Sequence, residues 1–174
     1  MPEFVDQVIL VDEHDHQIGV MDKMDAHRNG ARLHRAISVF LYNENGELLI
    51  QQRSMKKIVG AGQWANTCCG NVRPGERYED CARRRLREEL GILDVQIAPG
   101  QKFQYFAECN EEFSEREIDQ VFIGKYNGKV LPNPNEVQAI DYKSISDIKK
   151  DIIDKESLYA PWFRIMVEKG VYAI

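Results

Sequence analysis

The stretch CCGNVRPGERYEDCARRRLREELGI (residues 68–92) constrains the fold more than any other part of the chain. It begins as a loop that contains glycine, and small or apolar residues then recur at every fourth position, at Ala82, Leu86 and Leu90. This spacing predicts a helix over Glu79–Leu90, and the glycine that follows commonly ends a helix. One face of the helix is expected to pack on a sheet, while the adjacent face carries arginine and glutamate side chains.

The rest of the chain is dominated by strand patterns. Apolar stretches flank the polar turns EHDHQ and ENG, and each pair of stretches predicts an antiparallel hairpin. Such a mixture, with one central and two C-terminal helices, predicts an α/β (α+β) domain with a mixed sheet. The expected strands are 4–12, 18–22, 34–43, 47–53, 64–69, 103–109, 118–126 and 137–142, with a loop at 54–63 and further helices at 147–153 and 158–169.

Composition and charge exclude several classes of function. The net charge of −5 argues against a general nucleic-acid-binding protein, although a local site for an anionic small molecule remains compatible with it. The chain lacks a run of about 18 apolar residues and a secretory signal, so we expect no membrane span and a cytoplasmic location. The protein is expected to be a monomer or a small homo-oligomer. Reduced thiols are expected, because the cysteines form neither a C-x-x-C pair nor a spaced framework; they are Cys68, Cys69, Cys81 and Cys109.

The charged face of the central helix has two possible explanations. Arg85, Glu88 and Glu89 share one face, and Glu76 lies on the loop ahead of it, so their carboxylates could form an oxygen-rich site for Mg²⁺ or Mn²⁺. The alternative is a solvated helix surface stabilised by pairs such as Arg84–Glu88, each worth a few tenths of a kcal/mol. From the residues alone, both explanations stay open.

The spacing of this segment resembles the Nudix box, a loop–helix–loop that binds metal and diphosphate. The resemblance implies a Nudix fold, with a mixed β-sheet sandwiched between helices, as a single domain over residues 1–174. The box of the hydrolases has glutamate directly after its arginine, and this chain has Arg85 there, which argues against ordinary hydrolase activity. The matching residues are Gly70, Glu76, Arg84, Leu86, Glu88, Glu89, Gly91 and Ile92.

Further motifs resemble one branch of that superfamily, the type 1 isopentenyl-diphosphate isomerases. These motifs are DAHRNGARLHRA, GQWANTCCG and SEREIDQVF, and arginine directly after the box arginine is also found in that branch. The resemblance implies interconversion of isopentenyl and dimethylallyl diphosphate. It implies catalytic roles for Cys69, Glu117 and Tyr105, and binding of the small-molecule diphosphate by Lys23, Arg53, Lys57, Arg85 and Trp162.

The resemblance also implies two metal ions. One is Mg²⁺ bound with the diphosphate, for which Glu89 is the candidate ligand. The other is Mn²⁺, Zn²⁺ or Mg²⁺, with His27, His34, Glu115 and Glu117 as candidate ligands. In a strand, residues two apart share a face, so Glu115 and Glu117 are expected to reach one site.

The chemistry of moving a double bond fits these residue types. A proton is added at one carbon and removed at another, so the site needs an acid, a base and surroundings that tolerate positive charge. Cys69 and Glu117 are suitable partners, although the reversible reaction does not separate acid from base. Trp162 could stabilise a cation through the face of its ring.

Asn71 departs from the isomerase pattern, which has a third metal-binding histidine at this position. An amide oxygen is a poor substitute for imidazole with Zn²⁺ or Mn²⁺, so Asn71 is a doubtful ligand. Two alternatives therefore remain beside the isomerase. The chain could be a Nudix hydrolase of a nucleoside-diphosphate-type substrate, or a non-catalytic Nudix domain with a binding or regulatory role.

Overall fold

The computed structural model describes residues 6–173, and its sheet is organised around β3 (His34–Tyr42). This strand runs parallel to β8 (Ser114–Lys125) and antiparallel to β6 (Cys68–Asn71). Residues 36–41 of β3 are all buried, as expected for a strand that is covered on both faces. The central strand therefore holds β6 and β8 in register, and both of these strands carry predicted site residues.

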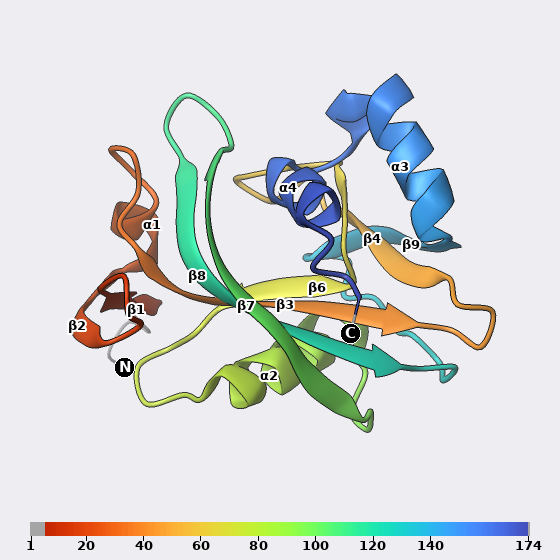
Figure 1. The fold of residues 1–174 in the computed structure, drawn as a ribbon, viewed down its shortest axis with the longest axis horizontal. Coiled ribbons are helices and arrows are strands. Elements are labelled where there is room, and N and C mark those ends of the chain that lie inside the picture. Colours follow the sequence, from red (N-terminus) through yellow and green to blue (C-terminus); the bar gives the residue numbers. More distant parts are fainter. Residues whose placement is uncertain (1–5, 174) are drawn as a thin grey trace.

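The other strands extend the sheet on both sides (Figure 1). The first predicted hairpin is confirmed, because the first two strands pair antiparallel. The longest antiparallel pairing joins β8 to β7 (Ile97–Glu108). The bounds of the remaining strands are β1 Gln7–Val11, β2 Gln17–Asp22, β4 Leu48–Arg53, β5 Trp64–Ala65 and β9 Val137–Lys143.

Helices cover both faces of the sheet, which confirms the predicted mixed-sheet arrangement (Figure 1). The predicted amphipathic helix is α2 (Tyr78–Leu90), and its apolar residues Ala82, Leu86 and Leu90 are fully buried in one core. The second core lies on the opposite face, under α3 (Ile145–Asp154) and α4 (Pro161–Lys169).

The second predicted hairpin is only partly right. β3 and β4 pair at Tyr42 and Leu48, next to the ENG turn, and then separate. The side chain of Thr67 lies between them and bonds to both, accepting from the amide of Leu41 at 2.9 Å and donating to the carbonyl of Leu49 at 2.7 Å. β6 then takes the place beside β3, so the strand with Cys69 reaches the centre of the sheet.

Further boundaries differ from the predictions. β7 begins at Ile97 and β8 at Ser114, six and four residues before the starts expected at 103 and 118. The strand expected at 64–69 is two strands, β5 and β6, and the helix expected from residue 158 begins at Pro161, whose ring is suited to a first helical position. A 3₁₀ turn, η1 (Glu156–Leu158), precedes it. The sequence patterns also missed α1 (Lys23–Ala26), which is too short to show periodicity and is capped by Asp22. Residues 4 and 5 of the first predicted strand lie outside the described residues.

Candidate functional site

A cavity of about 340 Å³ opens beside the ends of α1, β6 and α2 and the hairpin of β7 and β8. Its walls come from segments that are far apart in the sequence. All but one of the predicted site residues line it: Lys23, His27, Arg53, Lys57, Cys69, Asn71, Arg85, Glu89, Tyr105, Glu115, Glu117 and Trp162. The exception is His34, which is fully buried behind the cavity wall.

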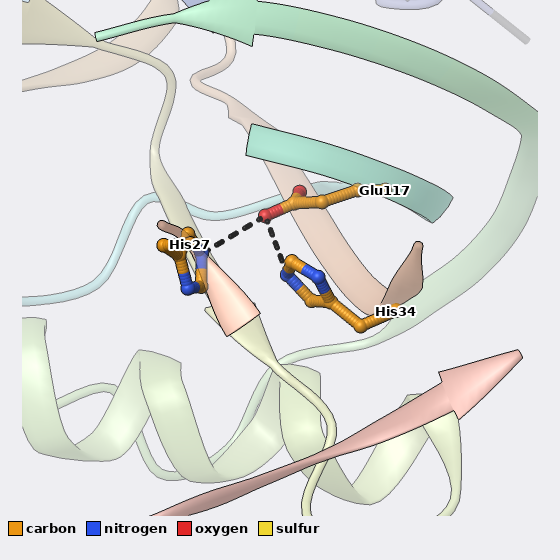
Figure 2. Close-up of side chains that lie close together, drawn as sticks. All are labelled: His27, His34 and Glu117. Carbon is orange, nitrogen blue, oxygen red and sulfur yellow. Dashed lines mark ion pairs between the residues drawn. The ribbon is translucent and has the colours of Figure 1, made fainter. Parts of the chain in front are cut away.

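His27, His34 and Glu117 form a compact cluster (Figure 2), and two of them, His27 and Glu117, line this cavity. One ligand atom from each lies within 4.8 Å of the others. The Oε1 atom of Glu117 is 3.3 Å from Nε2 of His34 and 3.9 Å from Nε2 of His27. The register of the parallel pair β3 and β8 places His34 directly beside Glu117, whereas His27 follows α1.

The hydrogen bonds of the two rings prepare this cluster for a divalent ion. Nδ1 of His27 lies 2.6 Å from the carbonyl of Lys23, and Nδ1 of His34 lies 2.7 Å from the carbonyl of Arg32. A carbonyl only accepts, so each Nδ1 carries a hydrogen, and each Nε2 is the atom that presents a lone pair when the imidazole is neutral. Nε2 of His34 is buried without a hydrogen-bond partner among the described residues. Two imidazole nitrogens and a carboxylate therefore fit a divalent metal ion.

Tyr105 connects the two glutamates of β8. Its hydroxyl lies 2.7 Å from Oε2 of Glu115 and 2.7 Å from Oε2 of Glu117, so both carboxyl groups are on one strand face, as predicted. Burial and the charge of Glu117 raise the pKa of Glu115. Burial would also raise the pKa of Glu117, but His27 and His34 outweigh it and hold that pKa below its usual range. A protonated Glu115 can therefore donate to the Tyr105 hydroxyl, which donates to ionised Glu117.

Two predicted ligands lie beside the cluster of His27, His34 and Glu117 rather than in it. Glu115 is not among the three grouped residues, because its carboxyl is turned to Tyr105. The amide nitrogen of Asn71 lies 3.3 Å from Oε1 of Glu117 and donates to it. Asn71 thus occupies the edge of the cluster as a hydrogen-bond donor in this orientation.

Cys69 lies on β6, directly opposite Ser38 of β3, and its side chain lines the cavity. Burial raises the pKa of its thiol well above the usual value, and the nearby carboxyl of Asp119 adds to the increase. Sequence patterns missed the buried polar residues around this sulfur: Ser38, Asn66 and Asp119. For Asp119 a signal was present, because it follows Glu117 by two positions on the same strand face.

The charged face of α2 is a connected network at the cavity rather than a solvated surface. Arg84 binds Glu76 at 2.7 Å, and Arg85 binds Glu88 at 2.8 Å and also pairs with Glu89. Glu89 is almost fully buried, and the charges around Arg85 raise its pKa although burial alone would lower it.

A second basic group faces the same cavity from the loop after β4. Nζ of Lys57 lies 2.5 Å from Glu136, a residue that the sequence patterns missed. Burial and the charge of Arg53 lower the pKa of Lys57, against the opposing effect of Glu136. The guanidinium of Arg53 lies 4.8 Å from the ring centre of Trp162, so the face of this ring does accept a cation.

Comparisons with known proteins agree on one family. Residues 32–163 match the NUDIX domain family. The chain is 42% identical over 169 residues to isopentenyl-diphosphate Delta-isomerase 1 of Aromatoleum aromaticum, covering 95% of this chain and 93% of that protein. It is 37% identical to isopentenyl-diphosphate Delta-isomerase of Burkholderia multivorans, covering 95% and 93% of the two chains.

Solved structures agree with this fold. A crystal structure of a Deinococcus radiodurans protein has a TM-score of 0.80 at 23% identity and covers 96% of this chain and 99% of its own. The MutT protein of Methanosarcina mazei has a TM-score of 0.62 at 26% identity, covering 79% and 91%. With the sheet, the amphipathic helix and the sequence matches in agreement, the chain belongs to the Nudix family and, within it, to the isopentenyl-diphosphate Delta-isomerases.

Proposed function

We propose that this protein interconverts isopentenyl diphosphate and dimethylallyl diphosphate by adding a proton at one carbon and removing one at another. The observation that carries the proposal is the cavity itself. It combines a protonated thiol at Cys69, an ionised carboxylate at Glu117 and a group of basic side chains in one space. The names of the relatives support the same reaction.

In this proposal Cys69 and Glu117 exchange protons with the hydrocarbon part of the substrate. Tyr105 holds the carboxylate in place and can pass a proton to or from it, because its hydroxyl bonds to Glu117 at 2.7 Å. The ring of Trp162, which already contacts the Arg53 guanidinium, would stabilise positive charge that develops on the substrate.

The basic residues on the loop after β4 and on α2 would bind the diphosphate. Arg85 and Lys57 now pair with carboxylates, and a diphosphate would compete with those carboxylates for them. The candidate residues for this role are Lys23, Arg53, Lys57 and Arg85. Glu89 is the candidate ligand of an Mg²⁺ ion bound together with the diphosphate.

A divalent ion fits His27, His34 and Glu117, and we propose that they hold one. When bound, it would fix the Glu117 carboxyl and tune its acidity. Nitrogen ligands favour Zn²⁺ or Mn²⁺ over Mg²⁺, and the carboxylate is compatible with all of these ions. Glu115 would remain the hydrogen-bond partner of Tyr105.

The arrangement of the box favours the isomerase over the hydrolase. A hydrolase of this family would need the carboxylates of the box to bind metal. Here Glu76 is bonded twice by Arg84, and Glu88 is contacted by both Arg84 and Arg85. These guanidinium groups neutralise the oxygens of Glu76 and Glu88, which leaves Glu89 as the box carboxylate for a metal once a diphosphate competes for Arg85.

The partner proposed here is a small-molecule diphosphate. No helix within residues 6–173 is both long and apolar enough to cross a membrane. The cytoplasmic location and the monomeric or small homo-oligomeric state stay predictions from the sequence.

Substitution of the two proton-transfer residues tests the proposal. In Cys69→Ala and in Glu117→Gln, kcat for isomerisation by the metal-loaded protein should fall by about 10²-fold or more, the scale of general acid–base catalysis. Cys109→Ala is the matched control, because Cys109 is a partly exposed thiol that does not line the cavity. Undiminished turnover in Cys69→Ala would contradict the proposed role of the thiol.

A further inference from the structure

The surroundings of the Cys69 sulfur are built from two fixed oxygen atoms. Sγ lies 3.1 Å from Oδ1 of Asn66 and 3.4 Å from Oγ of Ser38. Both neighbours are fully buried, so water does not replace them. Ser38 lies outside the motifs that suggested the site, and Asn66 lies within GQWANTCCG, where the sequence analysis gave it no role.

The side chain of Asn66 can face the sulfur in only one way. Its amide nitrogen donates to the carbonyl of Val39 at 3.2 Å and to that of Cys68 at 2.9 Å. Since those carbonyls only accept, the amide cannot be turned over without losing both bonds. Oδ1 therefore points at the thiol and accepts its hydrogen.

The hydroxyl of Ser38 is fixed by a third residue. It donates its only hydrogen to Oδ2 of Asp119 at 2.7 Å. The Oγ atom of Ser38 therefore faces Cys69 with a lone pair and can accept the hydrogen of the thiol.

From this geometry we infer that Ser38 and Asn66 are positioning residues for the Cys69 thiol: they share its single hydrogen, with the shorter contact to Asn66, and thereby fix the rotation of this side chain at the cavity, with Asp119 holding Ser38. The inference rests on the proposed function, because it assigns the purpose of this arrangement to proton transfer by Cys69. It predicts that a thiol freed from these acceptors rotates about its Cβ–Sγ bond and meets the substrate in a poorer geometry.

The infrared S–H stretching band tests the arrangement without requiring turnover. The band of Cys69 is isolated by subtracting the spectrum of Cys69→Ala from that of the full chain. We expect it at a lower frequency than the band of a free thiol. In Ser38→Ala it should move to a higher frequency, whereas Ser38→Thr, which keeps the hydroxyl, should leave it in place.

Kinetics then connect the arrangement to the reaction. Ser38→Ala should lower kcat by roughly 10- to 100-fold with little change in KM, as expected for a misplaced reacting group, and Ser38→Thr should recover most of the activity. Thr67→Val is the matched control. It removes another fully buried hydroxyl that does not contact Cys69, so it should leave the band unchanged.

Two results would overturn the inference. One is a Cys69 band at the frequency of a free thiol in the unaltered protein, which needs neither a folded variant nor an active enzyme. The other is an unchanged band in Ser38→Ala. If the band behaves as expected while the metal-loaded protein isomerises neither diphosphate, the proposed function fails but the positioning of the thiol stands.

Discussion

Single residues decide how a common fold is adapted here. Arg85 is the clearest example, because its guanidinium contacts Glu88, Glu89 and Glu136 and replaces the carboxylate that a hydrolase would have in the same place. The identity of this residue could be read from the sequence, but its partner Glu136 could not. They are 51 positions apart, and only the folded chain brings them together.

Asn71 gives a prediction at the same scale. Its amide lies 3.3 Å from Glu117, so a histidine at this position would add an imidazole nitrogen next to the cluster of His27, His34 and Glu117. We expect Asn71→His to bind Mn²⁺ or Zn²⁺ about 10- to 100-fold more tightly, as measured by calorimetric titration. Asn135→His, elsewhere on the cavity wall, is the control. Equal affinities in the original protein and Asn71→His would show that residue 71 is out of reach of the ion.

At the scale of elements, periodicity was a good guide where one face is buried. It predicted α2 to within one residue, and it placed Glu115 and Glu117 on one face of β8. The sequence did not predict how the second hairpin opens. β3 and β4 separate after their first pair because the hydroxyl of Thr67 lies between them and bonds to both. A turn sequence such as ENG predicts the turn and not how far the strands that leave it stay paired.

The end of α2 provides a test of this element. Gly91 has a φ of 64° and Gly170, at the end of α4, has a φ of 69°, a region that costs other residues about 1–2 kcal/mol. A Cβ at Gly91 would also lie 3.0 Å from Cβ of Leu131, whereas none of the described atoms lies within 4 Å of one at Gly170. Urea unfolding should therefore show a larger loss of stability in Gly91→Ala than in Gly170→Ala. The opposite order would mean that the loop around Leu131 yields easily.

At the scale of the whole molecule, Asp15 joins segments that are distant in sequence. It lies in the turn of the first hairpin and accepts hydrogen bonds from Arg35 of β3 at 2.7 Å, Tyr78 of α2 at 2.9 Å and Lys102 of β7 at 2.8 Å. The sequence marked this residue as part of a polar turn and no more. Its partners Arg35, Tyr78 and Lys102 belong to three different elements, and only the folded sheet places these elements next to Asp15.

This junction should make stability depend on pH. Burial would raise the pKa of Asp15, but the bonds from Lys102, Arg35 and Tyr78 outweigh it and lower the pKa. Because the folded-state pKa lies below the unfolded value of about 3.9, the stabilisation is present above that pH and is lost as the pH falls through the folded-state pKa. We expect Asp15→Asn to unfold more easily in urea at pH 7, by about 1–2 kcal/mol, with a smaller difference at pH 3.

Asn is a suitable replacement because it tolerates the positive φ of 64° at this position. The exposed Asp94 provides the control Asp94→Asn, which should leave the stability close to that of the original protein. If the free energy of unfolding of Asp15→Asn differs from that of the original protein by the same amount at pH 7 and pH 3, the charge of Asp15 does not contribute to stability.

The assembly of the site also belongs to this scale. Two histidines seven positions apart carry no geometry of their own, and α1, which positions His27, was too short to be predicted. The likeness to a known family predicted that His27, His34, Glu115 and Glu117 would meet at one ion, and the structure brings three of them together, without Glu115. The supporting residues Ser38, Asn66 and Asp119 were not predicted. Ser38 and Asn66 have no sequence pattern by which to recognise them, whereas Asp119 follows Glu117 by two positions on the same strand face.

The most direct test of the central claim is incubation of the metal-loaded protein with isopentenyl diphosphate in deuterated water, followed by NMR. An isomerase of the proposed kind should produce dimethylallyl diphosphate that carries deuterium in the methyl group formed by protonation, with no release of phosphate. Recovery of unlabelled isopentenyl diphosphate, or phosphate release in its place, would contradict the account.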